Sequence, residues 1–337
     1  NITQRVLNSS GSKTYDANTN ALAGAITLSN LVSGETLNHS GTASVSSANA
    51  GSYTISNLSG ISIADNAGTA SNYTLTGGTH NFTVNQRPLV ATLARQYDGT
   101  TTSAGSTLSS FDALQGGETL TMTGSGTAAS ANVANGIAMS SNGNLSLVDG
   151  TGDVSNYSLN STVINITQRV LNSSGSKTYD ANTNALAGAI TLSNLVSGET
   201  LNHSGTASVS SANAGSYTIS NLSGISIADN AGTASNYTLT GGTHNFTVNQ
   251  RVVSVNGTRL YNALSTAVAS DLSTHANLVG SQTLTLSGTG TIASKNVGSS
   301  KTVSLGTLAL ADGSNGGLAA NYTLTGGTHQ LTVNQRP

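Results

Sequence analysis

Apolar and polar residues alternate over short stretches throughout the chain. Residues 283–286 alternate Thr with Leu, residues 253–256 alternate Val with Ser or Asn, and residues 82–85 alternate an apolar side chain with Thr or Asn. Period-two runs of this kind, rich in Val, Ile, Thr and Tyr and bounded by Gly, Asn or Ser, predict half-buried β-strands. No stretch of helical length has the period of an amphipathic helix. The pattern therefore predicts an all-β fold.

The strand pattern returns with a fixed step along the chain. The stretch Lys13-Thr14-Tyr15-Asp16 comes back around tyrosines 97, 179 and 261, a step of 82 residues each time, and residues 1–87 are identical to residues 165–251. A constant step of this size indicates a tandem array. We therefore expect four domains, at residues 1–86 (residues 1–4 being the tail of a preceding repeat), 87–168, 169–250 (identical to the first) and 251–337.

The junctions between these domains are short. Residues 84–88, 166–170 and 248–252 contain no Gly/Ser-rich or Pro-rich linker, so we expect a stiff connection from one domain to the next. The predicted architecture is four tandem β-rich domains arranged end to end as a rod. The alternative is a parallel β-helix, which would need an inner period of about 20 residues. No such period occurs within the repeat.

Three short elements recur in each domain: the Tyr-Asp stretch, Gly34-Glu35-Thr36-Leu37, and Asn72-Tyr73-Thr74-Leu75. Two of their acids become amides in the last repeat, Asn262 and Gln282. An amide cannot act as a general acid or base, but it can accept a hydrogen bond from a turn. We therefore predict a structural repeat motif with no catalytic residue, and no enzyme. Its members are Tyr15, Asp16, Tyr97, Asp98, Tyr179, Asp180, Tyr261, Asn262, Tyr73, Tyr157, Tyr237 and Tyr322.

The tyrosines have two interpretations. As core aromatics they would be buried, with each hydroxyl bonded to a backbone partner; as exposed platforms they would stack on sugar rings. Aromatic residues make up 4% of the chain and Trp is absent, so the core interpretation is favoured, and the exposure of Tyr15 and Tyr73 decides between the two. His80, His244 and His329 have no partner at metal-ligand spacing. We expect them at the surface or at hairpin tips, with no metal and no cofactor.

Charge and composition narrow the partners. Charged residues make up 7% of the chain and the net charge is -2, which gives no attraction for nucleic acid. No apolar run approaches the 18 residues of a membrane span, so no membrane insertion is expected. Without Cys the chain has neither disulfides nor thiolate chemistry.

The recurring blocks, together with Lys295-Asn296-Val297-Gly298, resemble the YDG/MBG-type ("mostly β-grasp") tandem repeats of filamentous-haemagglutinin-like secreted bacterial adhesins. The resemblance implies a mostly β, β-grasp-like domain. It also implies the structural stalk of a large secreted adhesin or biofilm-matrix fibre, at the cell surface or in the matrix of a Gram-negative bacterium. Such a stalk would give reach and cohesion between cells or with a surface.

Two other functions remain open. Multivalent glycan-binding repeats would gain avidity from four weak sites. A self-assembling extracellular fibre would form through unpaired edge strands. The expected partners are other repeats of the same chain, with neighbouring copies in a fibre and extracellular polysaccharide as further candidates.

Overall fold

The computed structural model describes residues 1–337, apart from the side chains of Ser220 and Thr274. The fold is all-β, as predicted. The helical elements are single 3-10 turns: η1 Ala23–Ala25, η2 Ala70–Asn72, η3 Gly105–Thr107, η4 Val154–Asn156, η5 Ala187–Ala189, η6 Ala234–Asn236, η7 Ala269–Asp271 and η8 Ala319–Asn321. The chain divides into two compact units, Asn1–Gln168 and Arg169–Pro337, and each unit holds two repeats.

The first repeat forms one main sheet and one short strand pair. The strands are β1 Arg5–Val6, β2 Asn8–Thr14, β3 Asn20–Leu22, β4 Ile26–Ser29, β5 Asn38–Val45, β6 Gly51–Asn57, β7 Ile61–Ala64, β8 Tyr73–Thr74 and β9 His80–Asn85. The main sheet has the order β3-β5-β6-β9-β2-β4, with β7 paired to β5, and β1 pairs with β8. The first long strand, β2, runs parallel to the last, β9, in the middle of the sheet. This central parallel pair makes the repeat β-grasp-like.

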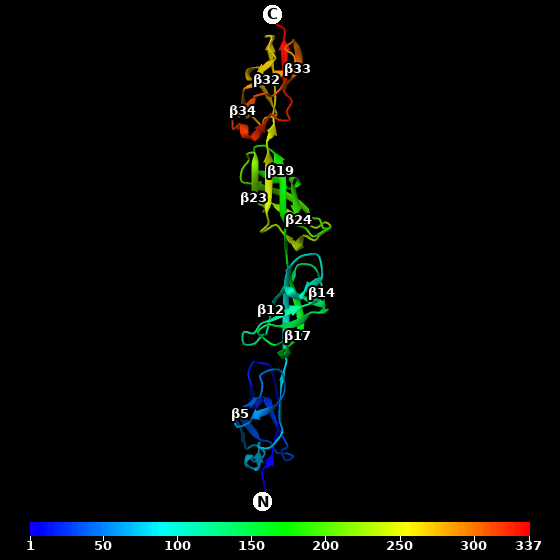
Figure 1. Cartoon of the computed structure of the whole chain (residues 1–337), viewed down its shortest axis with the longest axis vertical. Helices are drawn as coiled ribbons and strands as arrows, with labels where there is room; N and C mark the ends of the chain where they lie inside the picture. The colour runs from blue at the N-terminus through cyan, green and yellow to red at the C-terminus, as the bar shows by residue number, and fades with distance from the viewer. The chain divides into compact units, whose positions relative to one another are not determined.

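The second repeat keeps this order with longer central strands. Its strands are β10 Arg87–Gln96, β11 Thr102–Ala104, β12 Leu108–Phe111, β13 Leu120–Thr123, β14 Ser125–Ala128, β15 Ala134–Ser141, β16 Ser146–Asp149 and β17 Tyr157–Thr167. The sheet order is β11-β14-β15-β17-β10-β12, and β13 pairs with β16. Figure 1 shows the labelled strands β12, β14 and β17 together in one compact part, coloured cyan to green.

The second unit repeats this plan. Its third repeat contains β18 Arg169–Val170, β19 Asn172–Thr178, β20 Asn184–Leu186, β21 Ile190–Ser193, β22 Asn202–Val209, β23 Gly215–Asn221, β24 Ile225–Ala228, β25 Tyr237–Thr238 and β26 His244–Asn249. Its fourth repeat contains β27 Arg251–Val252, β28 Ser254–Leu260, β29 Thr266–Val268, β30 Thr274–Ala276, β31 Leu284–Ser287, β32 Thr289–Ile292, β33 Gly298–Ser304, β34 Ala309–Asp312, β35 Tyr322–Thr323 and β36 Gln330–Asn334. Again the first and last long strands are parallel neighbours, β19 with β26 and β28 with β36. Because each repeat has its own sheet, the β-helix alternative is not needed.

Alternation along the central strands builds the core. In β9 the residues at positions 80, 82 and 84 are buried, while those between them are more exposed. Phe82 lies against Gly11 of β2, where an added Cβ would come within 2.9 Å of the ring. The second repeat solves the same packing problem differently, because Leu93 and Ile164 replace this Gly and Phe and both are fully buried. A small-large pair is thus exchanged for two middle-sized side chains, which conserves the volume of the core.

One residue connects neighbouring repeats within a unit. Strand β9 ends at Asn85 and β10 begins at Arg87, and β26 ends at Asn249 where β27 begins at Arg251. The chain therefore passes from the last central strand of one repeat into the first central strand of the next. This continuity places the end of the first strand, with its Tyr-Asp stretch, beside the junction.

Candidate functional site

A tight turn holds each motif tyrosine at the end of its first strand. In the first repeat the Asp16 carboxylate accepts the Asn18 N–H at 3.3 Å and pairs with Lys13 Nζ at 2.8 Å. In the last repeat Asn262 Oδ1 accepts the Leu264 N–H at 3.1 Å. The turn needs an acceptor and no charge, so the amide serves as well as the acid.

The residue after the acid has a positive φ. Ala17 and Ala263 both have φ 61°, and Gly99 in the second repeat has φ 78°. Gly reaches this region without the steric cost that a Cβ brings. The Tyr-Asp-Gly form in the second repeat is therefore the unstrained version of the turn.

The turn delivers Tyr15 to the next repeat. Its ring packs edge-on against Tyr157, with the centroids 5.4 Å apart and the planes at 77°, and both rings are buried. The Tyr15 hydroxyl donates to Glu118 Oε1 at 2.6 Å. The Tyr157 hydroxyl donates to the other oxygen, Glu118 Oε2. One carboxylate thus joins tyrosines from two successive repeats.

Further hydrogen bonds secure the same contact. Arg87 Nη1 donates to the Tyr15 carbonyl oxygen at 3.2 Å. The Ala50 N–H donates to Asn156 Oδ1 at 2.7 Å, and Asn156 Nδ2 donates to Asn49 Oδ1 at 3.2 Å. We call this set of contacts between two successive repeats a tyrosine joint.

The second unit builds its joint with an amide in place of the acid. Tyr179 and Tyr322 lie 5.3 Å apart at 78°. Gln282 Nε2 donates to the Tyr179 hydroxyl at 3.0 Å, while the Tyr322 hydroxyl donates to Gln282 Oε1 at 2.5 Å. Gln is both donor and acceptor, so it satisfies two hydroxyls without a charge.

The backbone contacts of the first joint are also repeated. Arg251 Nη1 donates to the Tyr179 carbonyl oxygen at 3.4 Å. The Ala214 N–H donates to Asn321 Oδ1 at 2.7 Å, and Asn321 Nδ2 donates to Asn213 Oδ1 at 3.0 Å.

The phenols in the joints are held neutral. Burial raises the pKa of Tyr15, and its hydrogen bond to Glu118 raises it further. Burial and then the same carboxylate raise the pKa of Tyr157, and burial raises that of Tyr322. A neutral phenol on a hydrogen-bonded carboxylate is neither a nucleophile nor a general base, so the arrangement is suited to holding repeats together.

Comparison with known families decides the identity of the repeats. A family model described as the YDG domain matches residues 2–80, 83–164, 165–245 and 245–330. The chain belongs to the YDG domain family. No curated protein matches the chain.

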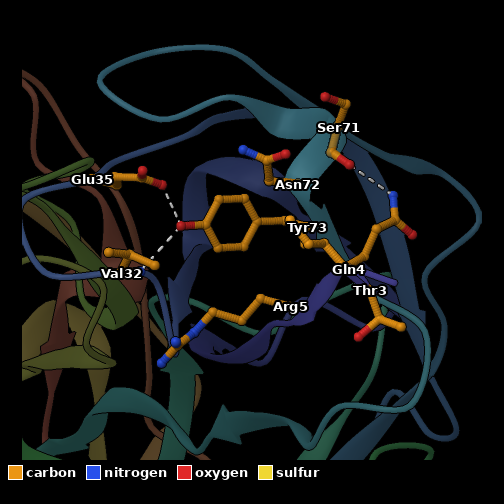
Figure 2. A pocket seen from close by; sticks show the side chains of 9 residues that line it. Thr3, Gln4, Arg5, Val32, Glu35, Ser71, Asn72 and Tyr73 are labelled. Carbon is orange, nitrogen blue, oxygen red and sulfur yellow. Dashed lines mark hydrogen bonds between the residues drawn. The ribbon is translucent and has the colours of Figure 1, made fainter.

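The first YDG repeat presents the receiving half of a joint at its N-terminal face. The Tyr73 hydroxyl donates to Glu35 and accepts the Val32 N–H at 3.1 Å, and Gln4 Nε2 donates to the Ser71 carbonyl oxygen at 3.1 Å. Figure 2 shows these contacts around a pocket of about 490 Å³, with the Arg5 side chain below the tyrosine ring.

The structure brings together only part of the predicted motif. Tyr15 meets Tyr157 of the following YDG repeat, and Tyr179 meets Tyr322. We expected each buried hydroxyl to find a backbone partner, but Tyr15 donates to a Glu118 side chain. The acids and the amide that follow the tyrosines stay in the turn.

The residues completing the joints were missed in the sequence. The missed residues are Arg87, Asn49, Asn156 and their counterparts, together with the role of Glu118. Each recurs once per YDG repeat, which was the available signal. What the pattern alone could not show was that these contacts cross from one repeat to the next.

The expectation for the histidines was wrong. His80, His244 and His329 are 5–6% exposed, not surface residues. His80 Nδ1 lies 2.9 Å from Ser9 Oγ, and Nε2 lies 2.8 Å from the Leu75 carbonyl oxygen. Ser9 and His80 are register partners in the central strands, which turns both side chains inward. Each ring therefore serves as a satisfied polar core residue.

Two searches of the described residues complete the description of the YDG repeats. Within residues 1–337, side chains of Ser220 and Thr274 aside, no group of three or more His, Cys, Asp or Glu is placed to hold a metal ion. Over the same described residues, no helix is long and apolar enough to cross a membrane.

Proposed function

We propose that this chain is a tension-bearing stalk region of a secreted bacterial adhesin or biofilm-matrix fibre. The observation that carries the proposal is the central parallel pair of each repeat. Strands β2 and β9 share six registered pairs, from Ser9↔His80 to Thr14↔Asn85, and β10 and β17 share ten. A pull on both ends of a repeat loads these strands along their length, so their hydrogen bonds must fail together.

The joints support the same function. A stalk must carry force from one domain to the next without a slack segment. One residue separates the central strands of neighbouring repeats within each unit, and the tyrosine joint bonds the same repeats through side chains. In the complete assembly, we expect the repeats to stand end to end and to hold binding regions away from the cell.

The other candidate functions have less support. Sugar stacking needs an exposed ring, but Tyr15 and Tyr73 are each 3% exposed. Edge-strand pairing needs long free edges, whereas the edge strands β3 and β4 of the first repeat have three and four residues. The neutral phenols of the joints offer no catalytic group, so we propose that the chain is not an enzyme.

The proposed location is extracellular, at the cell surface or in the matrix of a Gram-negative bacterium. Antibodies against residues 1–337 should label intact cells, and protease added outside the cells should remove the label. In-frame deletion of residues 5–168, one 164-residue period, should weaken cell cohesion under flow. Labelling that appears only after the cells are lysed would contradict the proposal.

A further inference from the structure

The N-terminal face of the first repeat has the geometry of a joint that has already received its partner. Arg5 Nε donates to the Asn30 carbonyl oxygen at 2.6 Å, and Nη2 donates to Asn30 Oδ1 at 3.1 Å. In the filled joint of the second unit, Arg251 is held by Asn277 through the same two nitrogens, at 2.7 and 2.9 Å. There the remaining nitrogen, Nη1, bonds the incoming tyrosine carbonyl. The Arg5 side chain is therefore pre-positioned for the same contact.

The other receiving groups are in place as well. The Tyr73 hydroxyl is already bonded to Glu35, as Tyr157 is to Glu118. Asn72 is exposed, whereas its counterpart Asn156 is 2% exposed within the first joint. Occupation of the face thus buries this amide. The pocket of about 490 Å³ lies where these groups converge (Figure 2).

The C-terminal repeat carries the matching inserted half. Tyr261 occupies the motif position of Tyr15 and is only partly buried, and its hydroxyl has no hydrogen-bond partner among the described residues. The Asn296 N–H bonds Ser294 Oγ at 3.3 Å, as the Asn49 N–H bonds Ser47 Oγ at 3.2 Å. The loop that supplies the backbone donor of a joint therefore has the same turn.

We propose that the face formed by Arg5, Glu35, Asn72 and Tyr73 docks the C-terminal end of a second copy of this chain. Tyr261 of the second copy takes the place that Tyr15 takes on the second repeat. Its hydroxyl donates to Glu35, and its carbonyl oxygen accepts from Arg5 Nη1. The contact joins two different surfaces, so it is heterologous and adds copies head to tail in an open series.

Within the same docked pair, Asn72 forms the remaining two bonds. Its Oδ1 accepts the Val297 N–H of the second copy, and its Nδ2 donates to Asn296 Oδ1, as Asn156 does with Ala50 and Asn49. The contact goes beyond the proposed stalk function, because it links separate chains. The contact area is that of a small interface, so we expect association at chain concentrations on the order of 0.1–1 mM.

A disulfide trap tests the docking directly, because the chain has no native Cys. One chain carries Asn72→Cys and the other Asn296→Cys, at positions whose counterparts Asn156 and Asn49 touch in the first joint. On mild oxidation, the mixture should form at least about ten times more dimer than a control pair carrying Leu22→Cys, an exposed residue of edge strand β3. Equal trapping of both pairs would overturn the proposal.

Complementation separates head-to-tail docking from any other association. A chain with Tyr261→Ala keeps only the receiving face, and a chain with Glu35→Lys keeps only the inserted end. Sedimentation velocity should show each variant as a monomer and the mixture as a dimer that does not grow further, whereas the wild-type chain continues to larger species. Association of either variant alone, or none in the mixture, would contradict the docking. Circular dichroism checks that both variants fold, and the disulfide trap does not depend on them.

Discussion

Removing the shared carboxylate of the first joint should open that joint. Glu118 accepts two phenol hydrogen bonds, one from each repeat. Hydrogen bonds to a charged group contribute about 1.5–3 kcal/mol each, and the half-buried position of this side chain favours the lower end. Glu118→Ala should therefore weaken the joint by about 3 kcal/mol, which is roughly 100-fold in its opening equilibrium.

Amide hydrogen exchange reads this opening at single residues. The Ala50 N–H donates to Asn156 Oδ1 across the joint, so its exchange reports whether the joint is closed. Its protection should fall by roughly 100-fold in Glu118→Ala and by roughly 5-fold in Glu118→Gln, because Gln282 shows that an amide can serve. Amides in the centre of strand β17 should keep their protection.

A matched control is available in the same unit. Glu35 has the same motif position and also accepts a tyrosine hydroxyl, but it lies at the N-terminal face of the first repeat. Glu35→Ala should leave the Ala50 amide unchanged. If Glu118→Ala changes its exchange less than about threefold, or if Glu35→Ala has the same effect, the carboxylate does not close the joint.

Three further predictions test the packing and the buried hydroxyls. Tyr15 has a raised pKa in the folded chain, so its contribution to stability is present below the unfolded value of about 10 and is lost as the pH rises above it. Melting temperatures from pH 8 to 11 should fall above pH 10, less steeply in Tyr15→Phe; equal slopes would refute this. Thr162 is buried with an unpartnered hydroxyl, so Thr162→Val should raise the free energy of unfolding by about 1 kcal/mol in urea titrations, and a loss would count against it. Gly11→Ala should cost about 1–3 kcal/mol, because its Cβ would meet a carbonyl oxygen at 2.2 Å, while the control Gly24→Ala, with nothing within 4 Å, should cost little. Similar losses in both would show that the close approach is unimportant.

The class of fold followed from the sequence because alternation along a strand is a local property. The Thr-Leu and Phe-Thr-Val-Asn runs state directly which face is buried. The order of strands is not local: β2 pairs with β9, 71 residues later, and nothing in either strand names its partner. The buried histidines were misjudged for the same reason, since the Ser9 hydroxyl that satisfies His80 comes from that distant strand.

The site was half visible in the repeat pattern. The replacement of acids by Asn262 and Gln282 correctly separated hydrogen-bonding roles from charge. It could not show that Tyr15 reaches Glu118, because residues with the same step look alike whether they meet within one repeat or across two. Only the geometry of the junction, with one residue between central strands, assigns the contact to successive repeats.

Single-molecule pulling tests most directly whether these repeats resist tension. Stretched from its two ends, the chain should unfold in four separate events. Each should release about 250 Å, since 82 residues extend to roughly 270–295 Å and the folded repeat spans roughly 30 Å.

The matched control applies the load through cysteines placed at Asn8 and Ser29, register partners at the end of the antiparallel pair β2–β4. This geometry opens hydrogen bonds one after another, so its unfolding force should be clearly lower than that for pulling on the ends. Equal forces in the two geometries, or extension from the ends without discrete events, would contradict the stalk account.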